Sequence, residues 1–280
     1  MIDLHMHTTA SDGRSTPEEL VAQAAAKGLR IMAVTDHDTT AGVDACRAAA
    51  RDAGLICHVG IEITSVDGGR DVHMLGYGFD PGQAELQGFL ARQRADRLRR
   101  LEEIGTRLAH LGVPVNLTAA MADAGRLAGR AMGRPMAAAA LVRAGHVADI
   151  REAFDRYLGE GKPAFVERIG PSPADVVALI TRAGGVASLA HPGKSQRDHL
   201  IAGLADAGLQ AIEVYHPDHD PIDTARYRQI AVSLGLLVTG GSDFHGVGST
   251  REKAFGHIHL PAADYARLAA RAGWLTIHAH

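Results

Sequence analysis

Two pairs of metal-ligand residues with the same spacing stand near opposite ends of the chain. His5 and His7 close the first apolar segment, and Asp243 and His245 follow a later one. Because residues two apart on a β-strand point to the same face, each pair can share one ion. Further histidines and carboxylates stand beside other expected strands, so the sequence predicts a multi-metal site. The complete set is His5, His7, Asp12, His37, Glu62, His73, His191, Asp243 and His245.

The types of donor atom restrict the metal. Cys46 and Cys57 are the only cysteines, and neither lies in a Cys-x-x-Cys pattern, which excludes thiolate zinc sites. A mixture of imidazole and carboxylate favours manganese, iron or zinc, because magnesium prefers a shell of oxygen atoms. We therefore expect two or three divalent ions of this kind.

The formal charge of the expected site indicates its substrate. Asp12, Glu62 and Asp243 contribute −3, so two divalent ions leave +1 and three leave +3 when the histidines are neutral. Such a site attracts an oxyanion and stabilises charge that grows on a phosphoryl group. We expect a metal-bound water as the nucleophile, with Asp12, His37 and His191 as the catalytic residues beside it. Metal-assisted phosphoester hydrolysis is favoured over serine chemistry, for which the sequence has no nucleophile elbow.

Five further residues are candidates for binding the substrate. Arg14 and Ser15 follow the first carboxylate closely, and His216 ends another expected strand. Arg134 and Lys162 stand in Gly-Arg-Pro and Gly-Lys-Pro triplets of the longest helical region. Arginine suits two-pronged phosphate contacts better than lysine does.

Two other charged features allow more than one interpretation. Asp36 and Asp38 flank His37 and are either hydrogen-bond partners of imidazoles or caps of a loop. The stretch 92–134 holds nine arginines and four acids, a local charge of +5. It is either a solvated helix face or a basic wall that guides a small anion.

The elements that must position these residues alternate along the chain. We expect strands near 1–6, 31–36, 56–62, 72–79, 186–190, 210–215, 236–241, 254–260 and 274–277. Helices are expected at 17–27, 40–53, 83–112, 173–184, 197–207, 222–234 and 262–272. The order strand, helix, glycine, strand is typical of parallel βα units, whose active sites lie at the carboxyl ends of the strands.

One region interrupts this alternation. About fifty residues after Leu111 lack a clear strand, and the run before it has helical spacing at Leu101, Ile104 and Leu108. We interpret 83–165 as a mainly helical insertion into a barrel domain formed by 1–82 and 166–280. Because all nine expected ligands lie outside it, the insertion should cap the active site.

Length and composition are those of a soluble globular protein. The chain has 280 residues, 46% apolar and 22% charged, with a net charge of −3. This charge does not favour binding to long duplex nucleic acid or to a membrane surface. No apolar run approaches the ~20 residues that span a bilayer. With no visible signal peptide and no disulfide pattern, we expect a cytoplasmic protein.

The motifs, taken together and in order, resemble those of the PHP family (polymerase and histidinol phosphatase domains). They are His-x-His, the early Asp, Thr-Asp-His-Asp, Gly-x-Glu, Ala-His-Pro and Ser-Asp-x-His. The resemblance covers nearly the whole length and implies a distorted (β/α)7 barrel with two or three ions, commonly Mn²⁺, with Zn or Fe also seen. It also assigns the ligands of each ion: His5, His7, Glu62 and Asp243 for the first, Glu62, His73 and His191 for the second, and Asp12, His37 and His245 for the third.

The resemblance extends to the insertion and implies a substrate. Gly133-Arg134-Pro135 and Gly159–Pro163 are similar to a branch that contains 3',5'-nucleoside bisphosphate phosphatases and short-RNA 5'-to-3' exonucleases. Members often continue the first triplet with His, where this chain has Met136. The favoured hypothesis is removal of the 3'-phosphate from a small nucleotide, with exonucleolytic cleavage of short oligoribonucleotides as the alternative.

Three weaker alternatives stay open. They are a histidinol phosphatase, an amidohydrolase and a non-catalytic metal-bound domain. The chain has only four lysines, and none ends an expected core strand where a carbamylated ligand would stand, which counts against an amidohydrolase. A non-catalytic domain would be expected to lack some ligands, whereas all nine are present.

Overall fold

A seven-stranded sheet forms the centre of the protein in this computed structural model, which describes residues 1–117, 121, 129 and 131–274. Neighbouring strands follow the chain in order from β1 to β7. The sheet nearly closes, since the Leu4 N–H donates to the Gly240 carbonyl at 3.1 Å and Met6 pairs with Phe244. The expected distorted (β/α)7 barrel is confirmed. The strands are β1 (Ile2–Asp3), β2 (Ile31–Val34), β3 (Ile56–Asp67), β4 (Arg70–Tyr77), β5 (Val186–Leu189), β6 (Ala211–Tyr215) and β7 (Leu237–Gly240).

The direction of β4 departs from the expected parallel pattern. It runs antiparallel to both β3 and β5. Gly68 and Gly69 form the turn between β3 and β4 with φ of +55° and +77°, a conformation that suits glycine in a two-residue hairpin. The start of β4 therefore lies at the same end of the barrel as the carboxyl ends of the other strands. His73 lies near the start of β4, as it does in the expected strand 72–79, and the reversal places it at this end.

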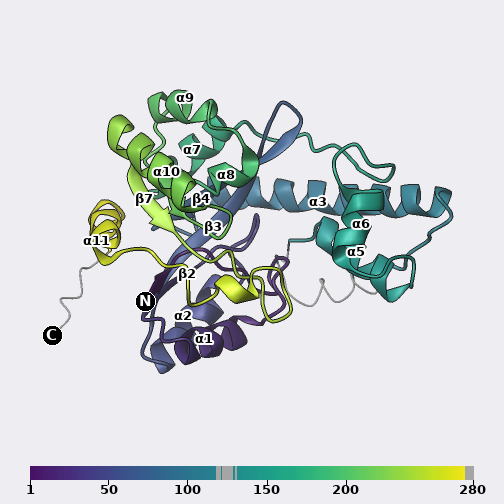
Figure 1. Ribbon diagram of the computed structural model, residues 1–280, viewed down its shortest axis with the longest axis horizontal. Coiled ribbons are helices and arrows are strands. Elements are labelled where there is room, and N and C mark those ends of the chain that lie inside the picture. Colours follow the sequence, from purple (N-terminus) through teal and green to yellow (C-terminus); the bar gives the residue numbers. More distant parts are fainter. Residues whose placement is uncertain (118–120, 122–128, 130, 275–280) are drawn as a thin grey trace.

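Helices surround the barrel where the sequence pattern placed them (Figure 1). The first begins with a capping box in which Thr16 and Glu19 each satisfy the other's backbone N–H. The expected strand at 254–260 is wrong, because it begins in the short 3-10 helix Glu252–Ala254 and continues through turns without pairing. Of the expected strand 274–277, residues 275–277 lie outside the described residues. The helices are α1 (Pro17–Ala26), α2 (Val43–Asp52), α7 (Pro173–Arg182), α8 (Pro192–Ser195), α9 (Leu200–Asp206), α10 (Pro221–Leu234) and α11 (Ala262–Arg271).

A long helix connects the barrel to a second, smaller core. The first part of α3 (Ala84–His110) buries Leu86 and Leu90 against the barrel. Its second part packs Leu101, Ile104 and Leu108 in a separate cluster with the helices that follow. Those are α5 (Arg134–Arg143), α6 (Ile150–Ala153) and the π-helical turn η1 (Phe154–Leu158). The domain limits at 83 and 165, and the capping role, remain predictions.

No helix in the described part of the chain combines the length and apolar character that crossing a bilayer requires.

Candidate active site

The Glu62 carboxylate lies at the centre of a ring of imidazoles. Its Oε2 is 3.2 Å from Nε2 of His5 and 3.2 Å from Nε2 of His7. Its Oε1 is 2.8 Å from Nδ1 of His73 and 3.0 Å from Nε2 of His191. The hairpin and the neighbouring strand ends thus bring residues that are far apart in sequence around one buried carboxylate.

Asp243 completes the group that we call the central cage, namely His5, His7, Glu62 and Asp243. Asp243 Oδ1 lies 3.5 Å from Nε2 of His5 and 3.3 Å from Nε2 of His7. All four residues are buried, and they offer ligand atoms within 4.8 Å of one another.

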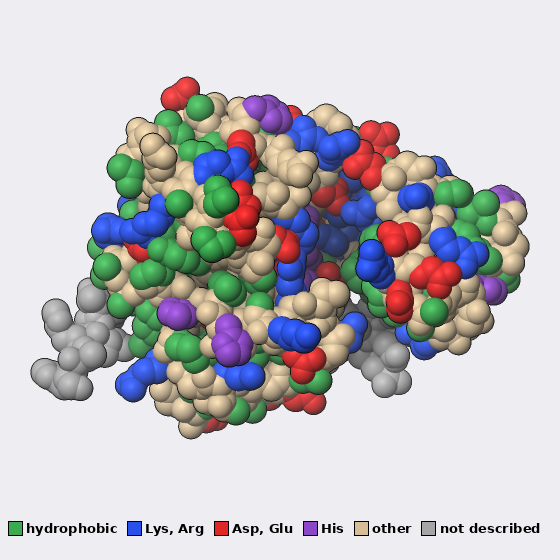
Figure 2. Space-filling view, in the orientation of Figure 1, with side chains coloured by type: hydrophobic (Ala, Val, Ile, Leu, Met, Phe, Trp, Pro, Cys, Tyr) green, Lys and Arg blue, Asp and Glu red, His purple; other side chains and the backbone are tan. Residues whose placement is uncertain are grey.

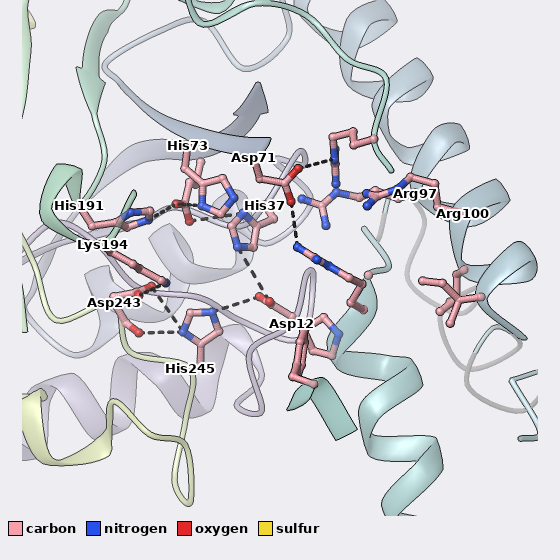
Figure 3. Close-up of a pocket in the computed structure, with 18 residues that line it drawn as sticks. Asp12, His37, Asp71, His73, Arg97, Arg100, His191, Lys194, Asp243 and His245 are labelled. Atoms are coloured by element: carbon pink, nitrogen blue, oxygen red, sulfur yellow. Dashed lines mark hydrogen bonds and ion pairs between the residues drawn. The ribbon is translucent and has the colours of Figure 1, made fainter. Parts of the chain in front are cut away.

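Asp12 gathers a second group beside the cage. Its Oδ1 lies 3.3 Å from Nε2 of His245 and 3.9 Å from Nδ1 of His7. Its Oδ2 lies 3.9 Å from Nε2 of His37. The structure therefore brings together all nine residues that the sequence analysis singled out. Seven of the nine line one cavity, which is drawn in Figure 3.

Several ring nitrogens in these groups have no hydrogen-bond partner among the described residues, so they are suited to bind metal ions. Neither ring nitrogen of His7 makes a hydrogen bond within the described part of the chain, and the same holds for Nδ1 of His37 and of His73. Two atoms that bind one ion at about 2.1 Å lie roughly 3.0–3.4 Å apart. The oxygen–nitrogen distances of the central cage, 3.2–3.5 Å, match this spacing.

Backbone conformation also marks the site. His191 has φ of +28° and Asp243 has φ of +53°, both in the left-handed region that residues other than glycine seldom adopt. The His191 backbone is held because its N–H donates to Glu213 Oε2 at 2.8 Å. Such strained positions concentrate at functional sites, where the surrounding structure enforces them.

The buried acids raise the pKa of His7, whereas burial dominates the pKa of His37. Burial alone lowers the pKa of His7, but Asp243, Glu62 and Asp12 raise it to about 10. Burial raises the pKa of Glu62, yet His37, His73 and His5 bring it well below its usual range. Burial lowers the pKa of His37 to about 3, against the pull of Glu62 and Asp12. The cage is therefore an environment that divalent cations can satisfy.

The cavity beside the cage has a basic opposite wall. It encloses about 200 Å³ and reaches from the imidazoles to the helices of the insertion. We call Arg97, Arg100, Arg134 and Arg168 the arginine wall. Figure 3 shows Arg97 and Arg100 across the cavity from His37 and His73, and Figure 2 shows basic side chains gathered in the hollow between the barrel and the second core.

Two carboxylates hold the arginine wall without neutralising it. Asp38 Oδ2 accepts from Arg97 Nε at 2.5 Å and lies 3.7 Å from Arg168 Nη1. Asp71 accepts from Arg134 Nη2 at 3.1 Å and lies 3.4 Å from Arg168 Nε. Four guanidinium groups against two carboxylates leave a local charge of +2. Burial and the neighbouring Arg97 lower the pKa of Arg168 to about 10. A bound anion would relieve this crowding.

Only part of this wall could be predicted from the sequence. Arg134 lines the cavity as expected, with its guanidinium 5.4 Å from the ring centre of Phe165. Arg97 and Arg100 belonged to the basic stretch but had no assigned role, and their spacing of three on one helix was the available signal. Arg168 and Asp71 were missed, since only the tertiary fold brings them together.

The other expected substrate residues lie elsewhere. Arg14 lies on a neighbouring groove, and its Nη1 donates to the Val247 carbonyl. Ser15 is buried with its hydroxyl donating to Gln23, and Lys162 is exposed beyond both cavities. His216 is buried, with Nε2 3.4 Å from Asp243 Oδ2.

Asp36 and Asp38 support the site, but neither makes a hydrogen bond with an imidazole of the described residues. Asp36 accepts from the Thr8 backbone and hydroxyl and from Ser11, so it fixes the loop that carries Asp12. Asp38 accepts from the Thr64 N–H and from Arg97. The loop-capping interpretation therefore describes Asp36, whereas Asp38 holds the arginine wall.

Three residues near the cage had no role in the sequence analysis. Glu213 accepts from His5 and from the His191 backbone. Lys194 Nζ lies 3.8 Å and Arg251 Nε 3.4 Å from Asp243 Oδ2. An acid inside the apolar strand Ala-Ile-Glu-Val-Tyr was the signal for Glu213.

Comparisons with known proteins agree with the geometry. The PHP domain family model matches residues 3–158. The 3',5'-nucleoside bisphosphate phosphatase of Chromobacterium violaceum is 36% identical, over 88% of each chain. The 5'-3' exoribonuclease of Haemophilus influenzae is 40% identical, over 87% of this chain and 89% of the relative. A Bifidobacterium adolescentis structure assigned to the metal-dependent phosphoesterases has a TM-score of 0.89 and 35% identity, covering 96% of each chain. The chain therefore belongs to the PHP family.

Proposed function

We propose that this protein is a metal-dependent phosphoesterase that removes the 3'-phosphate of nucleoside 3',5'-bisphosphates and releases the 5'-monophosphate. One observation carries the proposal: a single cavity is lined by seven of the nine expected ligands and by four arginines. A substrate with two phosphates matches a cavity with two sites for anions. The likeness to the Chromobacterium violaceum phosphatase supports the same conclusion.

The ligand groups of the proposal follow the geometry. His5, His7, Glu62 and Asp243 would hold one ion, Glu62 with His73 and His191 a second, and Asp12 with His37 and His245 a third. Divalent ions in these positions would activate a water molecule and stabilise charge on the phosphoryl group. Mn²⁺ is our first choice, with Zn or Fe as alternatives.

Residues around the cage would handle the protons of the reaction. Asp12 and His37 line the cavity beside His245, and His191 lies across the cage next to Lys194. Burial and Lys194 lower the pKa of His191 to about 3, which keeps its ring neutral. We propose Asp12 and His37 as the residues that orient the attacking water and His191 as the residue nearest the leaving oxygen.

The arginine wall would bind the 5'-phosphate. Arg168 and Arg100 are buried, and Nε of each makes no hydrogen bond within the described residues. A phosphate oxygen can accept from such donors, and a bond to a charged partner contributes about 1.5–3 kcal/mol. Leu101 and Ile104 of α3 line the same cavity and offer apolar contact for the nucleoside between the two phosphates.

Phosphate release tests the proposal directly. The substrates are adenosine 3',5'-bisphosphate and adenosine 3'-monophosphate, each assayed with Mn²⁺. We expect a clear preference in kcat/KM for the bisphosphate, because only it reaches both sites. Lack of turnover with any bisphosphate nucleotide would end the proposal.

A second candidate, cleavage of short oligoribonucleotides from the 5' end, is favoured by a larger groove. This groove of about 1270 Å³ shares Asp12, Asp243, His245 and Lys194 with the first cavity. Five cations line it against three acids, namely Arg14, Arg143, Arg151, Lys194 and Arg251 against Asp12, Asp149 and Asp243. Nucleotides beyond the scissile bond would follow this groove.

Chain-length preference separates the two candidates. On a ladder of 5'-phosphorylated RNAs, an exonuclease should cleave di- and trinucleotides with a kcat/KM at least equal to that for the bisphosphate. Arg143→Ala should then raise KM for the trinucleotide and leave the bisphosphate unchanged. Equal effects on both substrates would exclude the groove as the path of the RNA.

We also propose that the protein works in the cytoplasm. Both cysteines are free thiols, and Cys46 is buried. A reducing compartment suits such a protein.

A further inference from the structure

Strand β6 supplies none of the nine proposed ligands, yet its central acid lies directly beneath the central cage. Glu213 is completely buried. Its Oε1 lies 2.9 Å from Nδ1 of His5, and its Oε2 accepts the backbone N–H of His191 at 2.8 Å. One carboxylate therefore contacts a proposed ligand of the first ion and the backbone of a proposed ligand of the second.

Hydrogen-bond chemistry fixes the role of each contact. An ionised carboxylate only accepts hydrogen bonds, so Nδ1 of His5 must carry a proton. In the neutral ring that binds a metal, the lone pair of His5 is then on Nε2, the nitrogen that faces Glu62 and Asp243 in the cage. The bond to His191 holds a backbone with φ of +28°, which determines where that imidazole points.

We propose that Glu213 is a positioning residue that sets the tautomer of His5 and the backbone conformation of His191, and so determines metal affinity. The inference rests on the proposed metal site. Partners that bind the second nitrogen of a ligating histidine fix its ring, and their removal typically weakens metal binding by about 10–100-fold.

Glu213→Gln is the most informative change because it keeps shape and volume. The amide has one acceptor and one donor, whereas both contacts of Glu213 require an acceptor. If the amide oxygen keeps the His191 N–H, its NH₂ group faces Nδ1 of His5 and favours the tautomer with the proton on Nε2. If the amide oxygen instead accepts from Nδ1 of His5, the amide NH₂ group faces the backbone N–H of His191, and neither group can accept from the other. Either arrangement weakens one of the two proposed ion sites.

Metal titration provides the test. Chelator-treated wild type and Glu213→Gln are titrated with Mn²⁺ by calorimetry, and both are checked for folding by circular dichroism. We expect the affinity of at least one ion to fall about 10–100-fold in the variant. Unchanged affinity for every ion would overturn the proposal.

A matched control separates positioning from loss of a buried hydrogen bond. Ser188 and Thr239 share a buried hydrogen bond of 2.9 Å in the same barrel, and among the described residues neither side chain makes a hydrogen bond or ion pair with a proposed ligand. Ser188→Ala should cost stability and leave Mn²⁺ affinity within twofold of wild type. If it weakens Mn²⁺ as much as Glu213→Gln does, the effect of Glu213 is merely structural and the proposal fails.

A spectroscopic measurement on the wild type keeps the test decisive even where a variant does not fold. In ¹⁵N spectra of the Zn²⁺-loaded protein, with the His5 ring assigned from the spectrum of His5→Gln, we expect the proton on Nδ1. A proton on Nε2 would refute the proposal. Failure of the proposed phosphatase function has a different signature, namely normal metal binding without turnover of any bisphosphate.

Discussion

Arg134 offers a direct test of the idea that the cavity binds two phosphates. Its Nη2 lies 3.1 Å from Asp71, its side chain is 25% exposed, and its guanidinium lies over Phe165. Replacing it with alanine removes a charged donor from the arginine wall and leaves the nine proposed ligands in place. The effect should therefore depend on whether the substrate carries a 5'-phosphate.

The size of the effect follows from the contacts. A hydrogen bond to a charged group contributes about 1.5–3 kcal/mol. Pairing with Asp71 and partial exposure place Arg134 at the lower end, about 1.5–2 kcal/mol. Since 1.4 kcal/mol is tenfold, Arg134→Ala should lower kcat/KM for adenosine 3',5'-bisphosphate about 10–30-fold. For adenosine 3'-monophosphate the change should stay within about twofold, because that substrate does not reach the wall.

The assay compares both substrates in four proteins: wild type, Arg134→Ala, Arg134→Lys and Arg92→Ala. Lysine keeps the charge but loses the planar fork, so it should restore activity only in part. Arg92 is an exposed arginine on α3 outside the cavity and serves as the control. Equal losses on both substrates, or no loss on the bisphosphate, would refute a role of Arg134 in binding the second phosphate.

Three further outcomes are expected. Chelation should abolish hydrolysis. His7→Ala should lower the number of ions bound per chain, as measured by elemental analysis, and should lower kcat by more than 100-fold, as measured by phosphate release; full activity without metal would contradict the site. Tyr77→Phe should lower the free energy of unfolding in urea by about 1–2 kcal/mol, because the buried Leu4 carbonyl loses its donor at 2.9 Å; an unchanged value would contradict this. His58 is packed against Trp274, and burial lowers its pKa to about 4 from a usual 6.5, so the folded state resists protonation. The contribution of neutral His58 to the free energy of unfolding should be fully present above pH 6.5 and decline as the pH falls toward 4. Metal-free His58→Gln should therefore lose less stability between pH 7.5 and 5 than metal-free wild type does. Equal losses in urea titrations would show that His58 is not responsible.

The proximity of the nine expected ligands could be predicted because it depends on a local rule. In βα proteins the residues that follow the strands meet at one end of the sheet, so His5, His37 and Asp243 could be grouped without knowledge of their distances. Helix limits were also local, as the capping box at Thr16 and Glu19 illustrates. Strand ends and helix limits can be recognised from residues that are close together in the sequence.

Features that depend on distant partners were not predicted. The reversed direction of β4 was signalled only by Gly68-Gly69, a hairpin turn that the search for parallel units overlooked. Arg168 is separated in sequence from Asp38 and Asp71, and no periodicity links the three. The segment 254–260 has apolar residues at strand-like spacing, yet it forms no strand: Phe255 and Leu260 are buried against the barrel, and the Leu260 N–H donates one backbone hydrogen bond to Ile2 of β1.

The reversal of β4 also explains why α3 is so long. The chain leaves β4 at the end of the barrel opposite the active site. A helix of 27 residues is about 40 Å long, enough to return the chain past the end where the active site lies. Arg97 and Arg100 lie near the middle of α3, between a first part that packs against the barrel and a last part that packs in the smaller core. A single helix anchored in both cores thus sets the distance between the proposed metal ligands and the arginine wall. In the proposed phosphatase, changes at either end of α3 would alter which length of nucleotide fits, far from any group that touches the substrate.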